Sequence, residues 1–149
     1  MGGIGCNGYL SMQPELIDYR VPAGSWSVSS FSYTKPGIGS TSSLRLVIAR
    51  PDSTTANKFQ VVGLSNMVTT GPGTISVANF TLPTPIPVQG GDVLAMVSGV
   101  GAVCLLNVPG APSHYLNVPA TLAVGSSIIP NGQYGGSFSL NIAAQLVPR

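Results

Sequence analysis

Charged side chains are scarce in this chain. They make up 7% of its 149 residues, whereas a typical soluble domain has about 25%. The basic residues are scattered, with no run and no interleaved aromatic residues, and the net charge is only +2. We therefore expect no nucleic-acid partner and no attraction to an anionic membrane. The ten charged residues are Glu15, Asp18, Arg20, Lys35, Arg45, Arg50, Asp52, Lys58, Asp92 and Arg149.

Histidine is nearly absent, which limits the chemistry. A Ser-His-acid triad would have to use His114, and the chain has no Gly-x-Ser-x-Gly elbow. A cysteine nucleophile would have to pair Cys6 or Cys104 with that histidine. These three side chains have no close spacing for zinc, and the four carboxylates suit neither calcium nor a glycosidase pair. We interpret His114 as a loop histidine and predict a protein that is not an enzyme and has no metal or cofactor.

Long apolar runs are missing as well. No segment approaches the roughly 18 residues that a membrane helix needs, so we expect no membrane span. The first six residues lack the charged start and the apolar stretch of a secretory signal peptide. We take the chain to be either a mature form with an added Met or a cytosolic protein.

Short alternating segments separated by Gly, Pro and Asn turns dominate the rest of the chain. They predict about eight strands and no convincing helix, and hence an all-β, two-sheet antiparallel sandwich with jelly-roll topology. The expected strands are residues 25–33, 44–50, 59–64, 75–82, 93–97, 100–108, 115–124 and 137–147. Pro119 makes the seventh an edge strand or an irregular segment.

Two local patterns are more specific. Trp26 and Val28 share one parity and Phe31 and Tyr33 the other, so we expect a bulge at Ser29–Ser30. A proline-rich corner over residues 83–87 leads into a Gly-Gly-Asp turn and an apolar strand buried on both faces. We interpret Asp92 as a cap for that turn rather than a metal ligand.

The chain divides into residues 1–20, an irregular N-terminal arm, and residues 21–149, the sandwich domain. Residues 9–19 allow one helical turn at most. Cys6 and Cys104 predict a disulfide that would fix this arm and indicate an oxidising compartment; the alternative is two buried thiols in a cytosolic protein.

Five ordered segments carry a resemblance to a known group. They are Val21-Pro-Ala-Gly-Ser-Trp26, Leu44-Arg-Leu-Val-Ile-Ala-Arg-Pro51, Phe59-Gln-Val-Val-Gly63, Ile86-Pro-Val-Gln-Gly-Gly-Asp-Val-Leu94 and Phe138-Ser-Leu-Asn-Ile-Ala-Ala-Gln-Leu-Val-Pro148. The chain resembles uncharacterised secreted β-sandwich proteins common in actinobacteria, which tend to carry a cysteine shortly after the Gly-Asp strand, as Cys104 does here. The resemblance implies a fold and no catalytic residues.

Two functions are compatible with these features. The first is a secreted or cell-surface structural module that assembles with copies of itself into a filament, a layer or a closed oligomer. The chain has so few charged side chains that little electrostatic repulsion would keep separate copies apart. The second is a carbohydrate-binding module that uses exposed aromatic residues. Trp26, Tyr115 and Tyr134 are the candidate contacts, and we expect Tyr115 and Tyr134 in Gly/Pro-rich loops.

Overall fold

A computed structural model describes residues 3–37 and 41–149. The first two residues of the expected arm and three residues between the expected strands 25–33 and 44–50 lie outside these ranges. The described chain is almost entirely β-structure, with one short 3₁₀ helix, η1 (Ile17–Tyr19). Its strands are β1 (Gly3–Gly5), β2 (Tyr9–Met12), β3 (Ser25–Thr34), β4 (Ser42–Pro51), β5 (Phe59–Leu64), β6 (Val68–Thr70), β7 (Val77–Gln89), β8 (Val93–Ser98), β9 (Val103–Asn117), β10 (Ser127–Ile128), β11 (Gly132–Leu140) and β12 (Ala143–Pro148).

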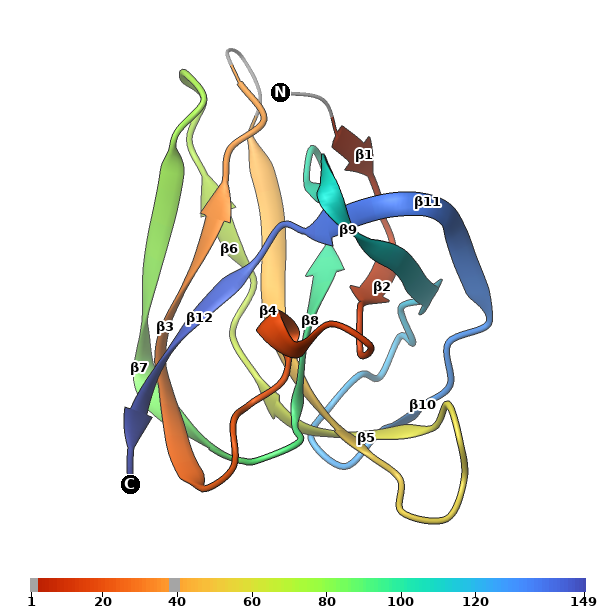
Figure 1. Cartoon of the computed structure of the whole chain (residues 1–149). Coiled ribbons are helices and arrows are strands. Elements are labelled where there is room, and N and C mark those ends of the chain that lie inside the picture. Colours follow the sequence, from red (N-terminus) through yellow and green to blue (C-terminus); the bar gives the residue numbers. More distant parts are fainter. Residues whose placement is uncertain (1–2, 38–40) are drawn as a thin grey trace.

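The strands form two antiparallel sheets, which confirms the predicted all-β sandwich (Figure 1). The nine-stranded sheet runs β1-β9-β2-β8-β4-β5-β10, with β11 paired to β9 and β6 to β4. The three-stranded sheet runs β12-β3-β7. The chain passes from the large sheet to the small one between β11 and β12 (Figure 1). Jelly-roll topology stays a prediction.

The large sheet is buried on both faces. One face packs on the small sheet through a main core that includes Phe31, Tyr33, Leu46 and Met96. Alternate residues on the other face form a second core, which includes Val47 and Ala95, with Val118, Leu122 and Ile128 of the segment after β9 packed into it. All six residues of β8 are buried, as expected for the strand after the Gly-Gly-Asp turn.

The N-terminal segment is more ordered than we expected. Its described part is not an irregular arm, because β1 pairs with β9 and β2 pairs with both β8 and β9. These ladders satisfy backbone groups that would otherwise need water. β6, β10 and a break at Asn141 that separates β11 from β12 also add strands, whereas the expected strand over 115–124 is not separate, because its first residues belong to β9. The described residues therefore form twelve strands instead of the expected eight.

Prolines that we expected to end strands lie inside them. Pro83, Pro85 and Pro87 belong to β7, an outer strand of the small sheet, where proline is tolerated because an outward N–H is not needed. Pro109 and Pro112 belong to β9, at a place where the register with β11 shifts and neither has a paired partner. The proline-rich corner is therefore part of β7, although residues 82–85 bulge out of its pairing with β3.

A disulfide joins Cys6 to Cys104 across 98 residues, as predicted, with a Cα–Cα distance of 5.7 Å. Both side chains are buried in the main core. In the chain-entropy model, closing a loop of this length stabilises the fold by about 4–5 kcal/mol. The disulfide ties the start of β2 to β9, and it is compatible with an extracellular location.

Candidate functional site

The outer edge of β12 is one of the two unpaired edges of the small sheet. β12 pairs with β3 on one side, and no described strand pairs with its other side. Ala143, Gln145 and Val147 are exposed, while Ala144 and Leu146 pack against the main core. An unpaired edge presents N–H and C=O groups that can accept another strand.

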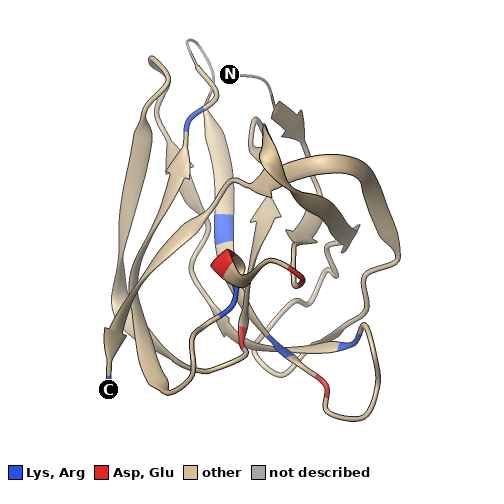
Figure 2. Ribbon diagram, in the orientation of Figure 1, with Lys and Arg blue, Asp and Glu red and all other residues tan. Residues whose placement is uncertain are grey.

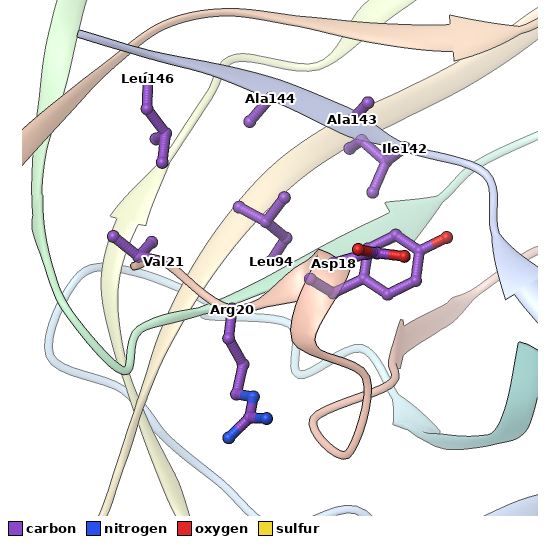
Figure 3. A pocket seen from close by; sticks show the side chains of 9 residues that line it. Asp18, Arg20, Val21, Leu94, Ile142, Ala143, Ala144 and Leu146 are labelled. Carbon is purple, nitrogen blue, oxygen red and sulfur yellow. The ribbon is translucent and has the colours of Figure 1, made fainter. Parts of the chain in front are cut away.

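A groove of about 260 Å³ runs beside this edge. Figure 3 shows Leu94 and Ile142 facing the space between β12 and the segment that follows η1, whereas Arg20 turns its side chain away from β12. Val21, Leu94 and Ile142 belong to the buried main core, so the groove gives access to the edge of that core. Its lining comprises Asp18, Tyr19, Arg20, Val21, Leu94, Ile142, Ala143, Ala144 and Leu146.

Tyr19 lines the groove. Its hydroxyl donates a hydrogen bond of 2.8 Å to the Leu140 carbonyl, next to the point where the chain changes sheets. Burial raises the pKa of Tyr19 above its ordinary value of 10.0, against a lowering by the neighbouring Ser139 hydroxyl. A second hollow, of about 250 Å³, lies on the far side of Tyr19 and shares Ile142 and Ala143 with the first.

Charges are distributed unevenly around this region. Figure 2 shows most of them near η1 and at the end of the molecule where β7 leads into β8. Asp18 lines the groove together with Ala143, Ala144 and Leu146 of β12. Arg149 directly follows the end of β12, and its Nε donates a hydrogen bond to the Trp26 carbonyl of β3. β12 itself has no charged side chain.

Asp92 caps the Gly-Gly-Asp turn as predicted, because its Oδ2 accepts the Gln89 backbone N–H at 3.0 Å. It also forms a two-point ion pair with Arg50, at 2.8 and 2.9 Å. The Asp92 side chain is 1% exposed and that of Arg50 38%. Hydrogen bonding to Asp92 raises the pKa of Arg50. Nothing in the sequence links the two residues, which are 42 positions apart.

His114 is not in a loop but in β9, because the ladder continues through Pro112. Its Nε2 is hydrogen-bonded to Glu15 Oε1. The neighbouring Ser113 hydroxyl instead bonds to the Met12 carbonyl at 3.5 Å. Both cysteines are in the disulfide. Among the described residues, no hydroxyl or thiol is hydrogen-bonded to His114, so the histidine and acid of a triad are together without its nucleophile.

Two of the three predicted aromatic contacts come together. Tyr115 and Tyr134 lie in β9 and β11, not in loops, with ring centroids 4.8 Å apart. Tyr9 of β2, which our sequence reasoning missed, packs edge-on against Tyr115 at 5.1 Å. The alternation Tyr9-Leu10-Ser11-Met12 was the available signal, since it is typical of a strand. We call these three residues the tyrosine cluster.

Trp26 lies apart from the tyrosine cluster, in β3, where it is paired with Val88 on one side and Pro148 on the other. Its indole N–H lies 3.1 Å from the Pro22 carbonyl and 3.3 Å from the Ala23 carbonyl, and donates to both. The indole is therefore held against the loop before β3. The three predicted aromatics do not form one surface.

No family model, curated protein or solved structure matches this chain. The described residues contain no helix that is both long and apolar enough to cross a bilayer, and no group of three or more His, Cys, Asp or Glu side chains placed to hold a metal ion.

Proposed function

We propose that this protein is a non-enzymatic, extracellular structural module that associates with copies of itself through the outer edge of β12. The observation that carries the proposal is this unpaired edge, which lies beside an apolar groove. A strand from a second copy would gain backbone hydrogen bonds from β12 and bury the groove. The disulfide supports the extracellular part of the proposal.

The composition of β12 favours a second copy as the occupant, because the strand has no charged side chain that would repel its own copy. Two β12 strands that pair antiparallel give a twofold-symmetric arrangement, which closes as a dimer.

A single added charge tests the proposal. Val147 lies in β12 and is 44% exposed, so Val147→Lys leaves the core intact and places a lysine on the edge. We expect the wild-type mass, measured by light scattering after size exclusion, to exceed the 15.2 kDa of one chain. Val147→Lys should return it to that of a monomer at the same concentration.

Two matched lysine variants serve as controls. Val77→Lys changes a 60% exposed residue at the start of β7, the opposite outer strand of the small sheet. Val124→Lys changes a 65% exposed residue outside any strand. Both should keep the wild-type mass. A monomeric wild-type protein at high concentration would refute self-association, and dispersal by Val77→Lys alone would move the interface to β7.

A further inference from the structure

We infer that the tyrosine cluster is a binding site for a neutral carbohydrate. The inference is independent of association through β12, because it rests on β2, β9 and β11. Two of its members were candidates from the sequence; the structure adds the third and brings all three into contact.

The three rings occupy one face of the large sheet. In the β2–β9 ladder Ser11 opposes Tyr115, and in the β9–β11 ladder Gly132 opposes it. Tyr9 and Ser11 share a face of β2, so the rings of Tyr9 and Tyr115 meet on that face. Each tyrosine of the cluster is half-buried rather than enclosed. Part of every ring is therefore available to a ligand.

Gly132 shapes this surface. A Cβ atom at Gly132 would lie 2.3 Å from the Tyr115 ring, so only glycine allows the ring to lie across β11. Tyr115 then supports Tyr134, with an angle of 39° between their planes. Tyr9 stands at 81° to Tyr115. The result is a stepped aromatic surface, on which the C–H faces of a sugar ring could pack.

The hydrogen-bonding groups of the cluster are not used within the described part of the protein. None of the three tyrosine hydroxyls has a protein partner there, and the buried Ser11 hydroxyl beside Tyr115 has none either. A buried hydroxyl without a partner costs free energy unless a ligand or a water bonds to it. Sugar hydroxyls both donate and accept, as tyrosine hydroxyls do.

Charge decides the class of sugar. No charged side chain belongs to the cluster, and burial raises the pKa of Tyr134, with smaller contributions from Tyr115 and Tyr9, so the ring stays neutral. The nearby ion pair joins His114 to Glu15. His114 directly precedes Tyr115 in β9, so its side chain lies on the opposite face of the sheet from the cluster. An acidic sugar would find no cation here, whereas a neutral one needs none.

The test is a calorimetric titration of the protein with neutral gluco-, galacto- and manno-oligosaccharides. A uronic-acid oligomer serves as the charged comparison. We expect at least one neutral oligomer to bind and the uronic-acid oligomer not to bind. Tyr134→Ala, which removes a ring, should weaken binding by about tenfold or more, and Tyr134→Phe by only about threefold. Trp26→Phe is the matched aromatic control and should bind as the wild type does.

A second measurement needs no variant. Nuclear magnetic resonance of the wild-type protein should show shifts of tyrosine ring signals on titration, while the indole signal of the single tryptophan stays unchanged. Failure of every neutral oligomer to bind would overturn the inference, as would shifts confined to the indole. Binding that survives Tyr134→Ala in a folded variant would place the sugar elsewhere and overturn it equally.

Discussion

β7 and β12 are the two outer strands of the same three-stranded sheet, yet they are built differently. β7 carries Pro83, Pro85 and Pro87, all exposed, which have no N–H to offer to a further strand. In the same strand, the buried Ile86 side chain packs closely on β5. A Cβ atom at Gly63 of β5 would lie only 2.4 Å from that side chain. β12 has a proline only at its last position and a groove in place of a packed neighbour.

The comparison teaches that a free edge is tolerated in this fold on one side only. On the β7 side the two sheets are in direct contact and the edge is blunted. On the β12 side the chain has just crossed from the large sheet, and the short segment around η1 does not fill the space that the crossing leaves. Three experiments would break or sharpen this contrast.

The largest expected effect comes from restoring N–H groups to β7. The triple variant Pro83→Thr, Pro85→Thr, Pro87→Thr gives the sandwich a second edge that can add a strand. A module with two such edges forms open chains instead of closed dimers, so the mass measured by light scattering should rise several-fold and depend on concentration. An unchanged mass would show that the prolines do not protect this edge.

The next effect is on stability. Ile86→Ala, on the closed side, should lower the free energy of unfolding by about 2–5 kcal/mol because it leaves a cavity in the main core. Leu146→Ala, on the open side, should cost only about 1 kcal/mol because the half-exposed side chain borders the groove. Urea denaturation of both variants gives the two values. Equal losses would mean that the β12 side is as tightly packed as the β7 side.

The smallest effect concerns the groove itself. Because the pKa of Tyr19 is raised in the folded state, its contribution to stability is complete below its unfolded pKa of about 10 and is lost as the pH rises through the folded pKa. Tyr19→Phe should cost about 1 kcal/mol near neutral pH, by removing the bond to Leu140, and should reduce the decline at alkaline pH.

Denaturation midpoints from about pH 8 to about pH 11 measure both parts of this effect. Tyr134→Phe is the matched comparison, because burial also raises the pKa of Tyr134, which lies away from the groove. This variant should also reduce the alkaline decline, but it should keep the stability near neutral pH because it removes no hydrogen bond within the described protein. An alkaline decline that is the same in Tyr19→Phe and the wild type would contradict the assignment to Tyr19.

Local patterns were enough to predict most of the longer strands and one irregularity inside them. The parity change between Val28 and Phe31 predicted a bulge, and Ser29 is indeed an extra residue in the pairing with β12, where Val28 and Ser30 oppose consecutive residues. Burial of Val28, Phe31 and Tyr33 follows from the same pattern. Such predictions succeed because alternation is a property of neighbouring residues, and neighbours are what a sequence displays.

The site could not be predicted in the same way. His114 and Glu15 are 99 residues apart, and Arg50 and Asp92 are 42 apart, so each pair depends on how the sheets close. Tyr115 and Tyr134 were recognised as aromatic candidates but expected in loops, because the glycines around them are also typical of turns. In the structure these glycines leave space for rings, as Gly132 does for Tyr115.

The disulfide also limits how copies of this chain can combine. Two molecules could in principle trade their first strands, each completing the sheet of the other, which is domain swapping. The Cys6–Cys104 bond fastens the beginning of β2 to β9 of its own chain, so this exchange would require a covalent bond to break. Copies of this chain that associate therefore each keep their own first strands, and that part of the fold stays intact when they join and separate.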